Sequence, residues 1–250
     1  MEYAEFLSRM KEIKAMGYVK SHRTGDTGIG KTLEDLLGIE ENNIAGPDFS
    51  TYELKAARKD SVSMLTLFTK APEPKGANKR LLEAFGYRQR TRLGDQTKML
   101  IHREEKIDES SVPTRDKELH VTVDSTKPNS VGLKLEIKSE KIIVVNEKGV
   151  DAYYDSDSLR QAFEKKYEKL IYVLAEHKKE QTSELFWYNE AFLLHGFDSE
   201  RFLAFVGDGL VKLDLRLGHY EDGRPHDHGT CFRVLPKYLP QCFQGVQKIL

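Results

Sequence analysis

Residues 47–55 have the sequence Pro47-Asp48-Phe49-Ser50-Thr51-Tyr52-Glu53-Leu54-Lys55, around which the rest of the chain is organised. In its second half apolar and polar side chains alternate, which predicts a strand. Because successive side chains of a strand point to opposite faces, Glu53 and Lys55 share one face and Leu54 points into the core. The segment between Asp48 and Glu53 is long enough for a bend that brings the two carboxylates together.

Two carboxylates and one ammonium group at one point suit the hydrolysis of a phosphodiester. Carboxylate oxygens are ligands that Mg²⁺ prefers, and a lysine can hold the negative charge that develops on a phosphate. We therefore predict a Mg²⁺ site at Asp48 and Glu53, with Lys55 as the catalytic cation. The acid-x-lysine pattern also occurs in the strand-like contexts of residues 136–138 and 176–178, which compete with this assignment.

The composition favours a globular protein of one large domain or two lobes. The chain has 250 residues and a formal net charge of −1, which argues against a sequence-blind DNA binder but allows a local basic surface. It contains no apolar run long enough to span a membrane, and residues 1–14 resemble an amphipathic helix rather than a signal peptide. Two cysteines, Cys231 and Cys242, fit a reducing cytoplasm without a metal cluster.

A glycine-rich segment, residues 25–32, matches the phosphate-loop pattern G-x-x-x-x-G-K-T. One hypothesis is a nucleotide-binding protein that uses Lys31 and Thr32. The preceding residues 18–23 are short and polar, whereas a phosphate loop follows a buried strand. The alternative is a glycine-rich turn that enters a helix and can hold a DNA backbone phosphate.

The helix after this turn carries an apolar stripe of Leu33, Leu36 and Leu37. Glu34 lies at the edge of the stripe and is the acid positioned to face the strands that follow. It could serve as a third carboxylate beside Asp48 and Glu53, or it could simply be a first-turn acid favoured by the helix dipole.

Further strands and a basic segment follow. The largely apolar residues 63–70 predict a third strand. Together with the preceding helix and strands, it indicates a mixed sheet backed by helices. Residues 75–106 are basic and fit a phosphate-contacting arm. Residues 119–124 and 133–146 are predicted to pair with each other, with a turn at 127–129. A helix over 158–170 and a buried strand over 171–175 are expected to complete the sheet.

Near the C-terminus, residues 211–217 alternate strictly and predict a half-buried strand whose polar face carries Asp214 and Arg216. A return strand over 230–235 places Arg233 on its polar face. Such a ribbon fits the DNA major groove, where arginine pairs with guanine and aspartate accepts from cytosine. The alternative is that Asp214 and Arg216 form a surface ion pair that contributes little to stability. The intervening His226-Asp227-His228 admits a zinc site, but a third ligand is not evident.

Taken together, the motifs resemble those of the MvaI/BcnI family of type II restriction endonucleases, which is related to the MutH nickase. The resemblance rests on GDTGIGKTLEDLL, PDFSTYELK, LTLFTKAP with KGAN, and LDLRLG with HDHGTCFR, which occur in the same order over nearly the whole chain. It is weakest between about residues 88 and 158. The resemblance implies an α/β fold of the PD-(D/E)XK, MutH-like class: a mixed sheet flanked by helices, with a C-terminal DNA-recognition lobe.

The resemblance also implies roles for individual residues. The catalytic and metal-binding set would be Asp48, Glu53, Lys55, the backbone carbonyl of Leu54, and Glu34 as an accessory acid. The major-groove readers would be Asp214, Arg216, His226, Asp227, His228 and Arg233. Candidate contacts to the DNA backbone are Lys31, Lys70, Arg88 and Arg90.

The expected activity is Mg²⁺-dependent cleavage of double-stranded DNA, one strand at a time, at a short site flanked by CC and GG. The enzyme would act as a monomer in the cytoplasm, while a cognate methyltransferase modifies the same site separately. We expect a catalytic lobe over residues 1–180, in which 75–150 form a DNA-contacting insert, and a recognition lobe over 181–250. The alternatives are a MutH-like repair nickase, a DNA-binding module without catalysis, and the nucleotide-binding protein considered above.

Overall fold

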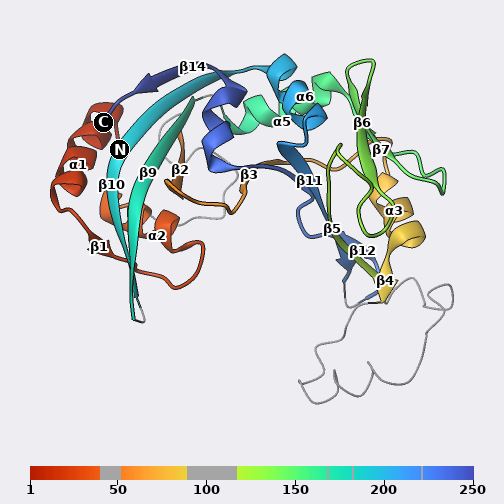
Figure 1. Cartoon of the computed structure of the whole chain (residues 1–250), viewed down its shortest axis with the longest axis horizontal. Helices are drawn as coiled ribbons and strands as arrows, with labels where there is room; N and C mark the ends of the chain where they lie inside the picture. The colour runs from red at the N-terminus through yellow and green to blue at the C-terminus, as the bar shows by residue number, and fades with distance from the viewer. Residues whose placement is uncertain (40–51, 89–116, 168, 182, 221) are drawn as a thin grey trace. The chain divides into compact units, whose positions relative to one another are not determined.

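The structure, a computed structural model, describes residues 1–39, 52–88, 117–167, 169–181, 183–220 and 222–250 (Figure 1). The chain clusters into two compact units. Unit 1 comprises Met1–Leu65, Arg160–Phe202 and Val234–Leu250, and unit 2 comprises Thr66–Leu159 and Leu203–Arg233. The chain therefore passes between the units several times, and residues 181–202 and 234–250 belong to the unit of the N-terminus rather than to a separate C-terminal lobe.

Unit 1 is built on a five-stranded mixed sheet in the order β1-β10-β9-β2, with β14 also on β10. The long strands β9 (Lys169–Glu180) and β10 (Ser183–Phe197) form an antiparallel pair, while β2 (Tyr52–Arg58) runs parallel to β9. Figure 1 shows these three strands side by side. One edge is formed by β1 (Val19–Lys20) and β14 (Phe243–Lys248), which pair with different parts of β10, and the other edge is β2. The predicted mixed sheet, with the strand of residues 171–175 beside that of Glu53, is confirmed.

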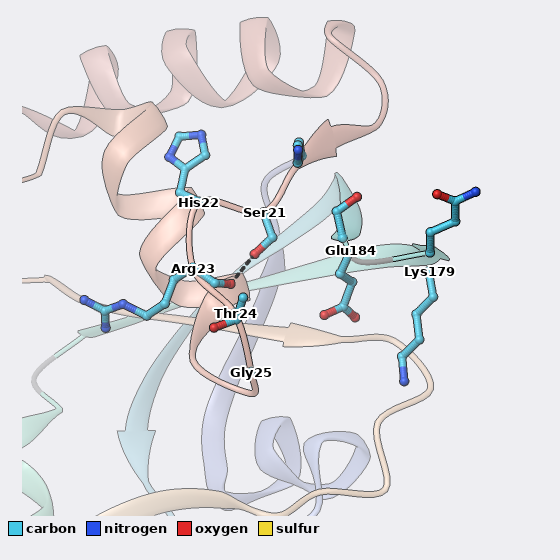
Figure 2. Close-up of a pocket in the computed structure, with 10 residues that line it drawn as sticks. Ser21, His22, Arg23, Thr24, Gly25, Lys179 and Glu184 are labelled. Carbon is cyan, nitrogen blue, oxygen red and sulfur yellow. Dashed lines mark hydrogen bonds between the residues drawn. The ribbon is translucent and has the colours of Figure 1, made fainter.

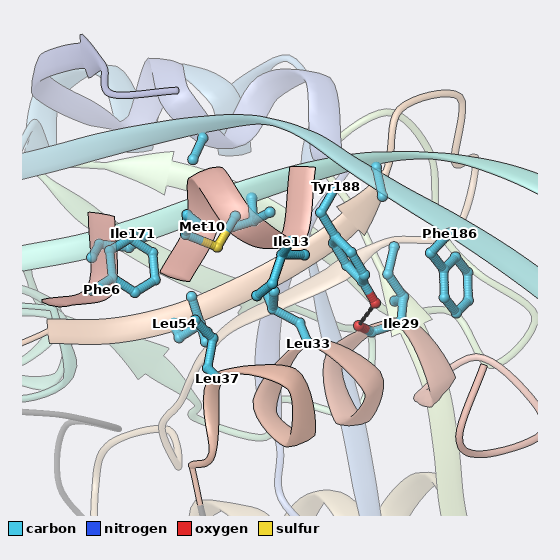
Figure 3. Close-up of a cluster of buried hydrophobic side chains, with 13 residues drawn as sticks. Phe6, Met10, Ile13, Ile29, Leu33, Leu37, Leu54, Ile171, Phe186 and Tyr188 are labelled. Carbon is cyan, nitrogen blue, oxygen red and sulfur yellow. Dashed lines mark hydrogen bonds between the residues drawn. The ribbon is translucent and has the colours of Figure 1, made fainter. Parts of the chain in front are cut away.

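Two helices, α1 (Tyr3–Ala15) and α2 (Gly28–Leu37), cover one face of this sheet. Their apolar residues recur at helical spacing: Phe6, Met10 and Ile13 on α1, and Ile29, Leu33 and Leu37 on α2. These side chains pack with Leu54 and Ile171 from the strands in one buried cluster, as Figure 3 shows. This packing places the face of β2 that carries Leu54 against the helices. Glu53 and Lys55, the residues on either side of Leu54, therefore point to the other face.

An aromatic cluster lies on that other face. It forms where α5 (Ser156–Lys166) leads toward β9 and where the 3₁₀ helix η3 (Pro236–Cys242) leads into β14. The rings of Phe163 and Phe197 are stacked with centroids 3.9 Å apart, and Tyr167 lies 4.8 Å from Phe163. The Tyr167 ring also lies 5.7 Å from the Nζ atom of Lys55, which places the cluster on the Glu53 and Lys55 side of β2.

Unit 2 contains a six-stranded and a three-stranded sheet. The larger has the order β3-β13-β11-β5-β4, with β12 also on β11. The bounds of its strands are β3 (Leu65–Thr69), β4 (Tyr87–Arg88), β5 (Lys117–Val123), β11 (Val211–His219), β12 (Pro225–Asp227) and β13 (Cys231–Val234). The smaller sheet consists of β6 (Lys134–Lys138), β7 (Lys141–Val145) and β8 (Tyr153–Tyr154). Among the described residues of this unit are α3 (Ala77–Phe85), the start of α5, and the larger part of α6 (Ser199–Gly207), which begins in unit 1.

Two strands lie where they were predicted, at β5 and β3, but their predicted partners are wrong. The strand near residues 119–124 does not pair with 133–146. Instead, β5 pairs antiparallel with β11, and β6 pairs with β7 across a two-residue turn at Ser139 and Glu140, both with positive φ. Likewise, β3 does not join the sheet of Glu53 but lies beside β13. A tight turn favours the local hairpin, whereas a pairing between distant strands leaves no local signal in the sequence.

The predicted C-terminal ribbon is confirmed as the neighbouring strands β11 and β13, and the structure adds β5 on the other side of β11. Over the described ranges, no helix is long and apolar enough to cross a membrane.

Candidate functional site

The acid-x-lysine motif on β2 folds as its spacing predicts. Glu53 and Lys55 point to the same face, with Lys55 Nζ 3.6 Å from Glu53 Oε1, and their side chains are 12% and 17% exposed. Both are thus mostly enclosed yet still reachable from solvent. Asp48 lies outside the described residues, so the pairing of the two carboxylates stays a prediction.

The structure also places Leu54 and Glu34. Leu54 is 8% exposed and packs in the same cluster as Leu33 and Leu37, so α2 lies against β2. Glu34 follows Leu33 directly and is half-buried. The helix that carries the predicted accessory acid is therefore packed against the strand that carries the predicted metal ligand.

A second lysine, which the sequence reading missed, reaches the same carboxylate. Lys166 Nζ lies 3.7 Å from Glu53 Oε1, and it too lies 5.7 Å from the centroid of the Tyr167 ring. Lys166 ends α5, and β9 begins three residues later beside β2, with Lys169 opposite Tyr52. The end of α5 therefore lies at the start of β2. The usable sequence signal was a lysine pair just before a buried strand.

The competing acid-x-lysine pairs are engaged in other contacts. Lys138 Nζ lies 2.8 Å from Glu136 Oε2 on an exposed part of β6, and the pKa of Glu136 is lowered mainly by this bond. Glu176 accepts hydrogen bonds from Asn189 (2.7 Å) and from the Tyr18 hydroxyl (3.2 Å). Lys178 lies over the Tyr18 ring, 4.0 Å from its centroid. These contacts account for both pairs as surface interactions.

The glycine-rich turn does not have the geometry of a phosphate loop. The strand before it, β1, has two residues and runs antiparallel to β10, whereas a phosphate loop follows a buried parallel strand. Lys31 Nζ lies 2.8 Å from Asp35 Oδ1, and Thr32 is fully buried, where its Oγ1 accepts a hydrogen bond from the backbone of His22. The nucleotide-binding hypothesis therefore has no support in the local structure.

A pocket next to this turn is lined by Lys20, Ser21, His22, Arg23, Thr24, Gly25, Lys179, Gln181, Ser183 and Glu184. Glu184 is held by Arg58, whose Nε and Nη2 atoms donate to its two oxygens at 2.7 and 2.6 Å. In Figure 2 the side chains of His22 and Arg23 point away from Lys179. Arg23 and Lys179 therefore do not converge on one anion.

In unit 2, Asp214 is the centre of a charged cluster. Its Oδ2 atom accepts hydrogen bonds from Arg233 Nη1 at 2.9 Å and from Arg216 Nη2 at 3.2 Å, while Oδ1 accepts from the Thr122 hydroxyl at 2.7 Å. Asp214 is only 7% exposed. Burial acts to raise the pKa of its carboxyl, but these three hydrogen bonds outweigh burial, and the pKa lies below the usual 3.8. The predicted trio of Asp214, Arg216 and Arg233 is brought together.

Both carboxylate oxygens of Asp227 accept hydrogen bonds from nearby groups. Its Oδ1 atom accepts from the backbone N–H groups of Gly229 at 2.9 Å and Thr230 at 2.6 Å. Its Oδ2 atom accepts from the side chain of Asn78 on α3 at 2.7 Å. These bonds hold the loop between β12 and β13 in a fixed shape, which Gly229 allows with φ 101°. Asn78, within the KGAN segment, was not predicted to act here.

The two predicted histidines of this loop form a cluster with a third. The rings of His226 and His228 are perpendicular with centroids 4.2 Å apart, and His120 on β5 lies edge-on to His228 at 5.7 Å. A Cβ atom on Gly218 would lie 3.0 Å from His228 Nε2, so this glycine makes room for the ring. Within the described part of the chain, no three His, Cys, Asp or Glu side chains are grouped so as to hold a metal.

The pKa of His228 lies below its usual value of 6.5. Burial is the main cause, followed by the neighbouring His226 and His120, while Asp227 and Glu118 act in the opposite direction. Replacing His120 with alanine is expected to raise this pKa, since it removes one of the two neighbouring rings whose electrostatic effect lowers it. An NMR titration of His228 measures the shift. His177→Ala, a change at an exposed histidine on β9, is the control, and an unchanged pKa in His120→Ala would contradict the ring contact.

The remaining predicted residues are the candidate contacts to the DNA backbone Lys70, Arg88 and Arg90. Lys70 Nζ lies 3.6 Å from Glu73 Oε1, and its backbone N–H donates to the carbonyl of Thr230. Arg88 lies on β4 opposite Lys117. Arg90 lies outside the described residues. The role of these residues as contacts to the DNA backbone stays a prediction.

Comparisons with known proteins cover the whole chain. The profile of the MvaI/BcnI restriction endonuclease family matches residues 7–243. A solved complex of the restriction endonuclease MvaI with its cognate DNA substrate is 29% identical over 100% of both chains, with a TM-score of 0.74. MvaI in the absence of DNA is 28% identical over 100% of this chain and 99% of its own, with a TM-score of 0.60. A search of curated proteins finds no match.

Proposed function

The chain belongs to the MvaI/BcnI restriction endonuclease family, and we propose that it is a Mg²⁺-dependent enzyme that cuts double-stranded DNA at a short site flanked by CC and GG, one strand at a time. The observation that carries the proposal is the convergence of Glu53 and Lys55 on one enclosed face of β2, 3.6 Å apart. A second cation, Lys166, reaches the same carboxylate.

The donor chemistry of the site fits a hard divalent cation. Glu53 offers a carboxylate on β2, the carbonyl of Leu54 follows it in the chain, and Asp48 would add a second carboxylate. Oxygen ligands of this kind suit Mg²⁺ rather than softer metals. When bound there, Mg²⁺ would polarise the phosphate and favour ionisation of the attacking water.

The lysines would supply positive charge where the phosphate accumulates negative charge. Lys55 is held by its strand on the same face as Glu53, so its ammonium group is oriented before substrate binds, and such preorganised charge favours the transition state over the ground state. Lys166 adds a second ammonium group from the end of α5. Glu34, on the helix packed against β2, would act as an accessory acid.

On unit 2, Arg216 and Arg233 would read guanines. A carboxylate that accepts hydrogen bonds from both guanidinium groups fixes their orientation, and Asp214 does this while it also bonds to Thr122. We therefore assign Asp214 to the positioning of the two arginines. Asp227, through its bonds to Gly229 and Thr230, would likewise position His226 and His228 for base contacts.

The proposal extends to the setting of the enzyme. It would act as a monomer on DNA in the cytoplasm, beside a cognate methyltransferase that modifies the same site. Lys31, Lys70, Arg88 and Arg90 are proposed contacts to the DNA backbone.

Digestion of a supercoiled plasmid of known sequence with the purified protein and Mg²⁺ tests this function. We expect nicked circles first, then linear DNA whose sequenced ends all lie within one CC/GG-flanked site, and no products when the Mg²⁺ is chelated. Products that stop at the nicked circle would favour the MutH-like nickase. Ends scattered over the plasmid, or an intact plasmid, would contradict the proposal.

A further inference from the structure

The polar face of β11 continues onto β5. In the antiparallel register Asp214 lies opposite Thr122, and Arg216 lies opposite His120. Side chains of directly opposed residues point to the same face, and the hydrogen bond from Thr122 to Asp214 confirms this for the first pair. His120 therefore stands beside Arg216 on the surface that carries the proposed guanine readers.

His120 is available for contact on this surface. Its side chain is exposed, whereas Leu119 and Val123, on the opposite face of β5, are fully buried. The Tyr87 hydroxyl fixes the backbone at this position, because it lies 3.2 Å from both the N–H and the carbonyl oxygen of His120. The imidazole thus projects from a strand that is held on both edges, by β11 on one side and by Tyr87 on the other.

The distance between opposed side chains of the two strands is somewhat larger than the rise between base pairs. Opposed residues of an antiparallel pair have Cβ atoms roughly 4.5–5.5 Å apart, while successive bases along a DNA strand are about 3.4 Å apart. Side chains at Arg216 and His120 can therefore reach neighbouring base pairs without crossing. An imidazole offers one N–H donor and one nitrogen acceptor, so it can bond to guanine or adenine N7 or accept from an exocyclic amino group.

We propose that His120 is a specificity-determining residue that contacts the base pair next to the one read by Arg216. This inference rests on the proposed function, since it assumes that the β5–β11 face, defined by Thr122, His120, Asp214 and Arg216, enters the DNA groove. It adds β5 to the elements that carry the other proposed base-contacting residues: β11, β13 and the segment of His226 and His228.

Binding to a panel of duplexes tests the inference. Each base pair of the site found by plasmid digestion is varied in turn, and competition Kd values are measured with Lys55→Ala as the uncut background. His120→Ala and Arg216→Ala are each added to this background. We expect His120→Ala to reduce discrimination roughly 5- to 100-fold at one base pair only, adjacent to the pair at which Arg216→Ala acts. His177→Ala is the matched control and should leave the whole profile unchanged.

Other results would assign a different role to His120. A uniform loss of affinity in His120→Ala would identify a phosphate contact and overturn the inference. Loss at the same base pair as Arg216→Ala would show that His120 acts only through that arginine, and an unchanged profile would show that it has no role. Each of these leaves the proposed function intact. A background protein without any preferred duplex would overturn the proposed function and this inference together.

Discussion

Replacing Lys55 with alanine is expected to lower the rate of DNA cleavage by roughly 10²- to 10³-fold or more, while the affinity for the recognition site changes little. The lysine supplies charge to the transition state, and the loss of one such preorganised group typically costs this much in rate. Glu53→Gln should show a similar loss, because it removes a negatively charged ligand of the proposed metal without changing the size of the side chain. Single-turnover cleavage and binding in the absence of Mg²⁺ measure the two effects separately.

Lys138→Ala is the matched control for this experiment. It removes the lysine of another acid-x-lysine pair, one whose side chain is 62% exposed on β6. We expect the rate of this variant to equal that of the unaltered protein. Normal cleavage by Lys55→Ala or Glu53→Gln would remove the active site from β2, and equal losses in all three variants would indicate a general effect of surface charge.

Replacing Asp214 with alanine is expected to weaken specific binding by about 3 kcal/mol, or roughly 100-fold, because it removes one partner from a buried set of hydrogen-bonded charges. Arg216 and Arg233 would lose the shared acceptor that orients them, and they would repel each other. Binding to a random duplex at low salt should not weaken, since the substitution removes a negative charge. Kd values for the two duplexes give the ratio that measures specificity.

Asp222→Ala controls for the change in net charge. Asp222 is paired with Arg224 at 2.7 Å, but both side chains are more than half exposed, so the pair should contribute little. This variant should keep the ratio of specific to random binding. If Asp214→Ala also keeps that ratio, the cluster of Asp214, Arg216 and Arg233 does not read the DNA sequence.

Much of unit 1 could be predicted from local patterns. Alternation placed Glu53 and Lys55 on one face of a strand, and helical spacing placed Leu33 and Leu37 on the buried side of α2. These predictions were confirmed because burial of an apolar face acts on each element by itself. Lys166 could not be found this way. It reaches Glu53 only because β9 runs parallel to β2, which brings the end of α5 to the start of the strand.

In unit 2 as well, local patterns predicted the strands but not all of their partners. Strict alternation identified β11 and the polar face of Asp214 and Arg216. It was also present in β5, where Glu118, His120 and Thr122 alternate with apolar residues, but the partner of that strand was assigned wrongly. That Asp227 contacts bases stays a prediction, and the sequence did not indicate the bonds that its oxygens accept from Gly229, Thr230 and Asn78. Side-chain type indicates which bonds a residue can make, and only its neighbours in space decide which of them form.

By itself, the sequence determined the class of the fold, the strand that carries Glu53 and Lys55, and the family to which the chain belongs, because periodicity and short motifs are local properties of the chain. The tertiary structure alone decided that Lys166 lies beside Glu53 and that His120 lies beside Arg216. Both placements bring together residues far apart in the sequence, through the pairing of β9 with β2 and of β5 with β11. The pairing of such strands depends on the burial of whole sheets rather than on any short segment.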